Sequence, residues 1–356
     1  MQLEKRLQLI REVGEEILTE DELKKLLEEK AHPVAYDGFE PSGNMHLAQA
    51  VLRAITVNKM TRAGCKFILW EADWHAWINN KMGGDLDKIH TVAQYFREIW
   101  KAAGMDLENV KFINATEVVD DQSYWKKIVQ VSQHTTIQRM MRCGQIMGRA
   151  DQEMQHVAQL LYPAMQAADI EHLGIDICQL GMDQRKVNIL AREVAPKLGW
   201  NKPVAVHHRM LAGLGQPPQD AGEGIDRAIA AKMSKSKPQG SIFVTDNQEE
   251  VTKKINNAWC PPEENENPIL EYLQYMVFEK QKAVTVERPA KYGGNQTFES
   301  YTALKEAYLA KKIHPADLKA TTAIEVNKLL DPIRKHFSKG KPAELLKAVL
   351  SFQVTR

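Results

Sequence analysis

The sequence has 356 residues, which is long enough for two domains, because a single hydrophobic core rarely grows past about 250–300 residues. Its 47 basic and 46 acidic residues give a net charge of +1, so a nucleic-acid partner would be bound by local basic patches and not by a global field. No apolar run approaches the ~18 residues of a membrane helix, and the four cysteines form no C-x-x-C pair. Composition therefore argues against a membrane protein, a zinc ribbon and a disulfide framework, and for a reducing compartment.

Residues 1–31 are predicted to form a helical extension. Leu3, Leu7 and Ile10 share one helix face, and Thr19 begins a capping box for a second helix. The segment lacks the apolar core of a signal peptide and carries too many carboxylates for a transit peptide. We therefore expect the protein to stay in the cytoplasm.

The segment 34–64 is predicted to be a strand that turns tightly into a helix. Ser42 is the expected N-cap of this helix, and Gly43 lets the backbone turn and approach a ligand. His46 then falls in the first helical turn, where free backbone N–H groups and the positive dipole end favour phosphate. The pattern predicts a phosphate site beside an imidazole, and a capping or surface histidine is the alternative interpretation.

Further strands and helices alternate along the chain until a helical insertion at about 118–160. The insertion carries Arg139, Arg142 and Arg149, which either face solvent or meet phosphate. The alternation predicts an α/β fold with a Rossmann-like parallel sheet, in a catalytic domain over residues 32–247. Expected elements are strands at 66–72, 110–114, 175–180 and 203–207 and a helix at about 84–103.

Polar and aromatic side chains gather where these elements end. The segment 73–77, with two tryptophans and a histidine, follows a strand at the edge where α/β sheets bind ligands, and its tryptophans are either pocket or core. Tyr162, Gln166 and Asp169 share one face of a predicted helix. That face either points to water or lines a polar pocket.

Residues 211–241 form a long loop rich in glycine and proline, and such loops in compact proteins are usually functional. Its far end, Lys232–Ser236, carries lysines and hydroxyls that suit a clamp on a highly charged leaving group, or else a disordered basic surface loop. Residues 248–356 are predicted to be an all-helical C-terminal domain, with Tyr292 on a glycine-rich turn.

Two phosphate-type motifs in one chain point to a family. The turn ending in His46 is similar to the HIGH signature, and Lys232–Ser236 to the KMSKS signature, of class I aminoacyl-tRNA synthetases. Within that class the chain resembles tyrosyl-tRNA synthetases of the archaeal and eukaryotic type from about Pro33 onward, including the segments 182–186 and 314–319. The resemblance implies a tyrosine–tRNA ligase that uses L-tyrosine, ATP with accompanying Mg²⁺, and tRNA(Tyr), without a structural metal or a membrane. It also implies a homodimer through 118–160 and an anticodon-binding role for 248–356.

The same resemblance implies roles for individual residues. Tyr36 and Asp169 would hold the phenol hydroxyl of tyrosine, and its amino group would be held by Tyr162, Gln166 and Gln184. The residues implied for ATP are Gly38, Glu40, Gly43, His46, Gln49, Asp183, Lys232, Met233, Ser234, Lys235 and Ser236, of which His46, Lys232 and Lys235 would act in catalysis. Those implied for tRNA are Arg142, Arg185 and Lys186 at the acceptor stem, and Tyr292, His314 and Asp317 in the anticodon-binding domain.

Some positions depart from the family pattern. Ala48 and Gln49 replace the glycine and second histidine of HIGH, although Gln49 can still donate a hydrogen bond, and Trp70 is larger than the residue expected beside the substrate pocket. Three alternatives stay open. A tryptophanyl-tRNA synthetase shares the fold, but Tyr36 with Asp169 favours a phenol. A small-molecule nucleotidyltransferase would not need the C-terminal domain. A tRNA-binding paralogue that lacks activation is supported only by the two HIGH replacements.

Overall fold

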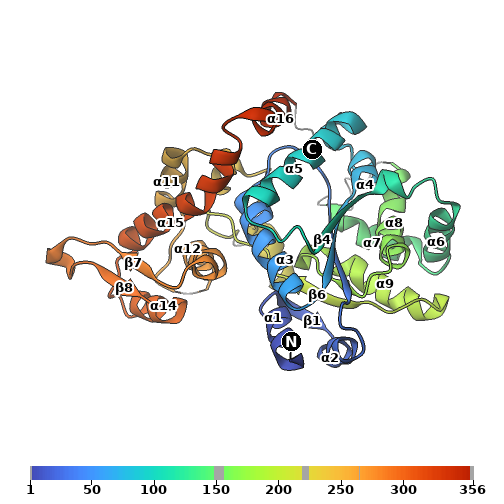
Figure 1. Ribbon diagram of the computed structural model, residues 1–356, viewed down its shortest axis with the longest axis horizontal. Helices are drawn as coiled ribbons and strands as arrows, with labels where there is room; N and C mark the ends of the chain where they lie inside the picture. Colours follow the sequence, from blue (N-terminus) through green and yellow to red (C-terminus); the bar gives the residue numbers. More distant parts are fainter. Residues whose placement is uncertain (1, 148–155, 219–223, 264, 353–356) are drawn as a thin grey trace.

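One six-stranded sheet lies at the centre of the catalytic part, and the structure, a computed structural model, describes residues 2–147, 156–218, 224–263 and 265–352. One edge strand pairs antiparallel with its neighbour, and all the other neighbours are parallel. This arrangement confirms the predicted Rossmann-like sheet (Figure 1). In spatial order the strands are β1 (Gly14–Leu18), β6 (Val204–His208), β5 (Ile177–Cys178), β2 (Val34–Phe39), β3 (Lys66–Glu71) and β4 (Val110–Asn114).

The helices of the described chain cover both faces of this sheet and build the C-terminal part. They are α1 (Leu3–Arg11), α2 (Glu20–Glu29), α3 (Arg53–Arg62), α4 (Asp73–Ile78), α5 (Leu86–Ala102), α6 (Gln122–Gln133), α7 (Ile137–Gly144), α8 (Ala158–His172), α9 (Arg185–Leu198), α10 (Gly224–Ala231), α11 (Gln248–Asn256), α12 (Pro268–Tyr272), α13 (Phe278–Lys280), α14 (Tyr301–Leu309), α15 (Pro315–His336) and α16 (Gly340–Ser351). Strand side chains alternate between two buried apolar clusters: Ala35 of β2 joins the cluster under α1, α3 and α5, and Tyr36 joins the cluster under α6 to α9.

The order of the strands places a crevice at the middle of the sheet. From β2 the chain moves outward through β3 to β4, and it then returns to the other side of β2 to form β5 and β6. In open α/β sheets, ligands bind outside the carboxyl ends of the strands at the point where this direction reverses. The segments that follow β2 and β5 therefore flank the place where a site is expected.

The C-terminal helices pack directly on the catalytic part. One continuous apolar cluster runs from α1 through α5 into α12, α15 and α16. At this contact the Tyr95 and Phe337 rings lie 5.2 Å apart, and His336 Nε2 lies 2.5 Å from a Glu98 carboxylate oxygen. α16 reaches back over α5 (Figure 1), and the expected division after residue 247 does not separate two hydrophobic cores.

Several predicted elements differ from the observed ones. The extension 1–31 is not purely helical, because β1 joins the edge of the sheet beside β6. The C-terminal part is not all-helical, because β7 (Val284–Val286) and β8 (Gln296–Phe298) form a hairpin. The strand expected at 175–180 is reduced to β5. These strands are all short, so their own residues carry little pattern, and the pairing that defines β1 and β5 is with strands distant in the sequence.

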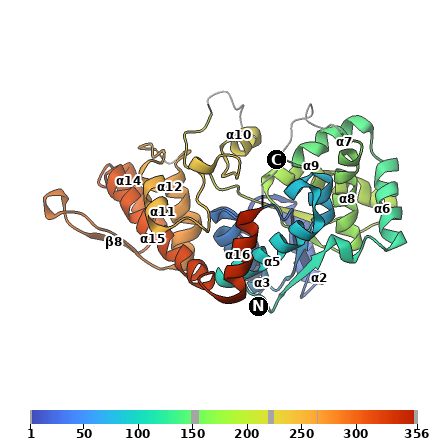
Figure 2. The same cartoon turned by 90° about the horizontal axis from the view of Figure 1, so that it is seen from above.

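The predicted loop and the predicted helical insertion are both more divided than expected. The loop 211–241 includes α10, which Figure 2 shows between the C-terminal helices and the α7–α9 side. The insertion at 118–160 is divided into α6, α7 and the start of α8, and Arg149 lies outside the described residues. Within the described part of the chain, no helix combines the length and the apolarity that crossing a membrane requires.

Candidate active site

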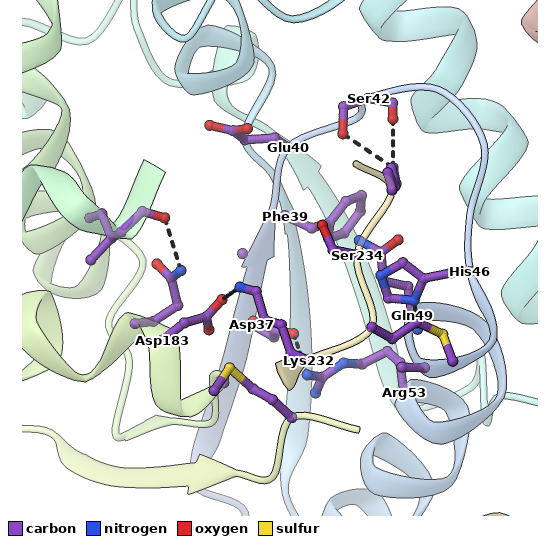
Figure 3. Close-up of a pocket in the computed structure, with 18 of the residues that line it drawn as sticks. Asp37, Phe39, Glu40, Ser42, His46, Gln49, Arg53, Asp183, Lys232 and Ser234 are labelled. Atoms are coloured by element: carbon purple, nitrogen blue, oxygen red, sulfur yellow. Dashed lines mark hydrogen bonds and ion pairs between the residues drawn. The ribbon is translucent and has the colours of Figure 1, made fainter. Parts of the chain in front are cut away.

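A cavity of about 1740 Å³ lies at the carboxyl ends of β2 and β5, where the strand order reverses. Figure 3 shows side chains from the turn after β2, from the segment after β5 and from the loop before residue 238 directed into it. The structure thus brings together most of the predicted site residues. Those that line the cavity are Tyr36, Gly38, Glu40, His46, Gln49, Tyr162, Gln166, Asp169, Asp183, Gln184, Lys186 and Lys232 to Ser236.

The turn after β2 differs in detail from the prediction. Gly43 has φ +69°, a conformation that favours glycine, but it is not among the residues that line the cavity. Ser42 is not an N-cap, because the helical segment begins with a π-helical turn at Ala48–Leu52 that continues into α3. His46 directly precedes this segment, and the Ala50 N–H donates to its carbonyl oxygen at 3.0 Å. His46 therefore lies before the first turn and not within it.

His46 is held as a neutral imidazole. Its Nδ1 lies 3.4 Å from the Gln49 N–H as a long acceptor contact, which leaves the ring proton on Nε2. Burial lowers the pKa of His46 to about 3, and the nearby Lys235 and Lys232 act in the same direction. The imidazole can therefore donate one hydrogen bond from Nε2 without carrying a charge.

The lysines of the KMSKS-like segment already have partners in the cavity. Lys232 Nζ lies 2.6 Å from Asp183 Oδ2, and Lys235 Nζ donates to the Ser42 carbonyl oxygen at 2.5 Å (Figure 3). Lys235 also lies over the Phe96 ring, 5.1 Å from its centroid. Burial lowers the pKa of Lys235 to about 7, so this lysine titrates near neutral pH.

The backbone of this segment is anchored at two adjacent residues. The Met233 N–H donates to the Leu211 carbonyl oxygen at 2.8 Å, and the Ser234 N–H donates to Ser241 Oγ at 3.1 Å. Met233 is buried, and the Ser234 and Ser236 hydroxyls lie 2.9 Å apart. The prediction of a disordered basic loop is therefore wrong for residues 232–238, which have a defined place in the cavity wall.

Buried polar atoms without partners mark one end of the cavity. The Tyr36 hydroxyl, Trp70 Nε1 and His75 Nδ1 have no hydrogen-bond partner in the described structure, and Asp169 Oδ2 makes no hydrogen bond although it lies 3.3 Å from His75 Nε2. The other oxygen of Asp169, Oδ1, accepts a hydrogen bond from the Tyr124 hydroxyl at 2.8 Å. Because burying unpaired polar groups is costly, this end is built to receive a polar group of a ligand.

A second group of polar side chains lies nearer the turn after β2. The Tyr162 hydroxyl donates to Glu40 Oε1 at 2.8 Å, and Gln166 Nε2 donates to Gln184 Oε1 at 3.1 Å. Gln184 Nε2 in turn donates to the Ile146 carbonyl oxygen at 3.2 Å. The carboxylate and the amide oxygens of this group are suited to a ligand that carries an amino group.

The residues predicted to contact tRNA lie mostly outside the cavity. Near the cavity, Arg142 is exposed and Lys186 bonds to Gln145, whereas Arg185 is bound by both oxygens of Glu16 at 3.0 and 2.8 Å. In the C-terminal part, Tyr292 is 62% exposed on the turn between β7 and β8. His314 caps α15 by accepting a hydrogen bond from the Ala316 N–H at 3.1 Å, and Asp317 lies in the first turn of that helix.

The sequence interpretation missed a buried charge cluster in the same cavity. Arg53 and Asp37 form an ion pair with an N···O distance of 2.8 Å, and both line the cavity together with His208. The sequence could have indicated Arg53 as a site residue. His46, Gln49 and Arg53 are spaced by three and four residues, which would place them on one face of a helix.

Trp74 and Trp77 neither line the pocket nor are fully buried. Trp74 Nε1 donates to Thr116 Oγ1 at 3.2 Å, Trp77 is 44% exposed, and neither lines the cavity. Among the described residues, no group of three or more His, Cys, Asp or Glu side chains could hold a metal ion.

Comparison with known proteins gives a consistent result. Residues 28–331 match the family described as tRNA synthetases class I (W and Y). The chain is 47% identical over 360 residues to tyrosine–tRNA ligase 1, cytoplasmic, of Arabidopsis thaliana, which covers 100% of this chain and 90% of the relative.

Two solved structures show the same fold. A Pyrococcus horikoshii tyrosyl-tRNA synthetase complexed with L-tyrosine has a TM-score of 0.90 and 38% identity, covering 98% of this chain and 100% of its own. A Leishmania major tyrosyl-tRNA synthetase in complex with tyrosinol has a TM-score of 0.90 and 41% identity. This comparison covers 99% of the present chain but only 61% of the Leishmania chain.

Proposed function

The chain belongs to the class I tRNA synthetases of the tryptophan and tyrosine group, as a tyrosine–tRNA ligase, and we propose that the cavity at the carboxyl ends of β2 and β5 carries out both steps of the reaction. In the first step a carboxylate oxygen of tyrosine attacks the α-phosphorus of ATP. The bond from that phosphorus to the bridging oxygen breaks, and pyrophosphate leaves. In the second step a ribose hydroxyl at the tRNA end attacks the tyrosyl carbonyl carbon, and AMP leaves.

The residues present suit a reaction that depends on positioning and charge stabilisation. His46 is placed to donate a hydrogen bond from Nε2 to a phosphate oxygen, and Lys232 and Lys235 are placed to move onto the leaving pyrophosphate. The attacking group is the substrate's own carboxylate, so no enzyme nucleophile is required. Magnesium enters with ATP as part of the substrate and neutralises phosphate charge.

The observation that carries the assignment to tyrosine is the set of unpaired atoms at the end of the cavity. A phenol hydroxyl can donate to Asp169 Oδ2 and accept from the Tyr36 hydroxyl, and so pair two buried groups at once. The indole of tryptophan has only a donor and cannot satisfy both groups. The amino group of the substrate would then lie near Tyr162, Gln166 and Gln184.

We assign tRNA binding to two surfaces. Arg142 and Lys186 lie on the α7 and α9 side of the cavity, where the acceptor end has to enter. At the far end, Arg288 ties the Tyr292 turn to the α14–α15 connection, because its Nη1 donates to the Lys312 carbonyl oxygen at 2.6 Å. That contact holds an exposed ring beside the helix start that carries Asp317, as a site reading a base needs.

We propose that the insertion at 118–160 forms the interface of a homodimer. Large apolar side chains are exposed on α6, on α7 and in the residues around them. A partner surface typically covers such side chains. They are Trp125 at 37%, Val129 at 55%, Ile137 at 74%, Met141 at 38%, Val157 at 79% and Leu161 at 40%. We place the enzyme in the cytoplasm, in line with the Arabidopsis relative's name.

The test is tyrosine-dependent exchange of pyrophosphate into ATP, with tryptophan as the competing substrate. We expect exchange with tyrosine and little with tryptophan. Exchange with tryptophan alone would identify the other branch of the family. No exchange with either amino acid, together with retained tRNA binding, would show a paralogue that has lost activation. Exchange that needs neither amino acid would point to a different nucleotidyl transfer.

A further inference from the structure

A four-charge cluster lies on the floor of the cavity, below the place assigned to ATP. Asp37 and Arg53 form one ion pair, and Asp183 and Lys232 form a second one. In Figure 3 the four side chains lie beside one another, between the end of β2 and the segment after β5. The cluster is neutral overall, with two carboxylates and two cations.

The two pairs differ in depth. The side chains of Arg53 and Asp37 are 8% and 11% exposed, whereas those of Lys232 and Asp183 are 28% and 27% exposed. Arg53 belongs to α3, and Lys232 belongs to the loop that follows α10. The deep cation is therefore fixed to the fold, and the shallow one is on the segment that we expect to move.

Arg53 is held from several sides. Its Nη1 donates to Gln179 Oε1 at 2.7 Å and lies 3.4 Å from Thr56 Oγ1. Its Nη2 lies 2.7 Å from His208 Nε2. Because a guanidinium has only donors, His208 accepts and stays neutral, and burial together with Arg53 lowers the pKa of His208 well below its ordinary value. The guanidinium group of Arg53 is therefore held in place and cannot move with a ligand.

The deep pair and the shallow pair are electrostatically coupled. The charge of Asp183 raises the pKa of Asp37 and of Arg53, and burial is the largest influence on both. Burial raises the pKa of Asp37 to about 6 even though Arg53 opposes the rise. Asp37 therefore depends on Arg53 to stay ionised near neutral pH.

This arrangement has a consequence for the proposed reaction, on which the inference rests. When Lys232 leaves Asp183 to bind the polyphosphate, Arg53 is the cation of this cluster that stays in place, beside the buried carboxylate of Asp37 and the half-buried carboxylate of Asp183. We propose that Arg53 is a positioning residue for ATP: it is the fixed cation that holds Asp37 as a carboxylate beside Asp183, so that Asp37 accepts hydrogen bonds from the nucleoside hydroxyl or amino groups. Arg53 acts through this carboxylate and need not touch the substrate.

The test compares Arg53→Met, Arg53→Lys and the parent in tyrosine-dependent pyrophosphate exchange between pH 6.5 and 8.5. Without the cation, we expect the pKa of Asp37 to rise by about one unit. For a rise from about 6 to about 7, the ratio of the ATP KM at pH 6.5 to that at pH 8.5 should be about threefold larger in Arg53→Met than in the parent, because the ionised fraction of Asp37 at pH 6.5 falls from about three quarters to about one quarter. The tyrosine Kd should be unchanged.

Arg53→Lys keeps the charge but cannot bridge Asp37, Gln179 and His208 at once. We expect it to raise the ATP KM at every pH and to keep the parental pH ratio. If Arg53→Met fails to bind tyrosine, Arg53→Lys becomes the decisive variant. A KM ratio between pH 6.5 and 8.5 that is larger in Arg53→Lys than in the parent would overturn the proposal, because the positive charge is still present. The matched control is Arg62→Met, an exposed arginine of the same helix α3, and it should behave as the parent.

The outcomes separate this inference from the proposed function. An inactive parent would contradict the function itself. An active parent with an unchanged pH ratio in Arg53→Met would overturn only the role of Arg53. Equal losses of tyrosine and ATP binding in Arg53→Met at all pH values, repeated in Arg53→Lys, would show that Arg53 only supports the fold.

Discussion

The Tyr124 hydroxyl donates a hydrogen bond to Asp169 Oδ1 at 2.8 Å, while Oδ2 of the same carboxylate has no hydrogen-bond partner in the described chain. Tyr124 belongs to α6 of the insertion, and Asp169 belongs to α8. One oxygen of the carboxylate is thereby fixed, and the other, which lies 3.3 Å from His75 Nε2, is the one that we propose for the substrate hydroxyl. Burial raises the pKa of Asp169 to about 8, and the Tyr124 hydrogen bond opposes this rise.

The first prediction concerns selection of tyrosine over phenylalanine. Sites that hydrogen-bond a substrate hydroxyl reject the deoxy analogue by roughly 10⁴–10⁵, a range for which tyrosyl-tRNA synthetases are themselves the established example. Asp169→Ala should erode this discrimination strongly. Tyr124→Phe should erode it by up to about 10-fold, because it removes the hydrogen bond that holds the Asp169 carboxyl group in place. The measurement is kcat/KM for both amino acids in pyrophosphate exchange.

The control for this prediction is Tyr95→Phe. The Tyr95 hydroxyl is also in a buried environment, but it donates to Asn44 Oδ1 at 3.0 Å, away from the pocket end. It should leave discrimination unchanged. If Asp169→Ala kept the parental preference for tyrosine, the phenol would lie elsewhere in the cavity.

The second prediction concerns His46. Removing one donor that acts in the transition state typically costs about 10²–10³ in rate, so His46→Ala should slow tyrosyl-adenylate formation by this amount and leave tyrosine binding intact. Burial and the two lysines lower the pKa of His46 to about 3. The reaction rate of the parent should therefore show no pH dependence from protonation of His46 between pH 5 and 8. A His46→Ala rate within a few-fold of the parent would contradict the role.

The third prediction concerns the loop lysines. Lys232→Ala and Lys235→Ala should slow adenylate formation in single-turnover experiments with both substrates saturating. Since the pKa of Lys235 is lowered to about 7, this lysine is mostly uncharged in the free enzyme at pH 8. The polyphosphate favours the charged form, so ATP binding at pH 8 should take up a proton.

Calorimetry in buffers of different ionisation enthalpy measures this uptake. It should disappear in Lys235→Ala and persist in Lys237→Ala, whose Nζ donates to the Ala230 carbonyl oxygen at 3.0 Å in the same loop. Unchanged single-turnover rates in Lys232→Ala and Lys235→Ala would reduce the segment to part of the cavity wall.

The fourth prediction separates activation from tRNA charging. Tyr292→Ala and Asp317→Ala should leave pyrophosphate exchange near normal and lower the rate of charging, because base–aromatic stacking is worth about 1–3 kcal/mol per base. A tRNA changed at the first anticodon base should already be charged slowly by the parent enzyme. Asp317→Ala should lower the charging rate of that tRNA only a little further. Asp331→Ala, near the other end of α15, is the control. Strictly additive losses would show that Asp317 does not touch that base.

The fifth prediction concerns the homodimer. Ile137→Glu and Val129→Glu place a charge on the exposed apolar side chains of α7 and α6, and each should raise the dimer Kd by at least about 10², since burying an unpaired charge is costly. Leu350→Glu, on α16 and 56% exposed, should have no effect. Sedimentation equilibrium measures the assembly. A monomeric parent, or dimers that persist in both glutamate variants, would refute this interface.

Local patterns in the sequence were sufficient for much of the fold. β4 begins and ends where it was predicted, and the capping box at Thr19 is present, with the Glu22 N–H donating to Thr19 Oγ1 at 3.2 Å. Such elements are defined by residues close together in the chain. The short strands β1, β5, β7 and β8 were missed or misjudged, because each is stabilised by a partner strand that is distant or has little pattern of its own.

The sequence by itself determined which chemistry is present, because the HIGH-like and KMSKS-like segments each carry their residues within a few positions of one another. It could not decide the pairing of side chains across the cavity. Tyr124 with Asp169 and Arg53 with Asp37 are joined only when α6, α8, α3 and β2 pack around the sheet. Burial there removes water from charged groups, and the neighbours that replace the water set each pKa and leave open the hydrogen bonds a substrate can make.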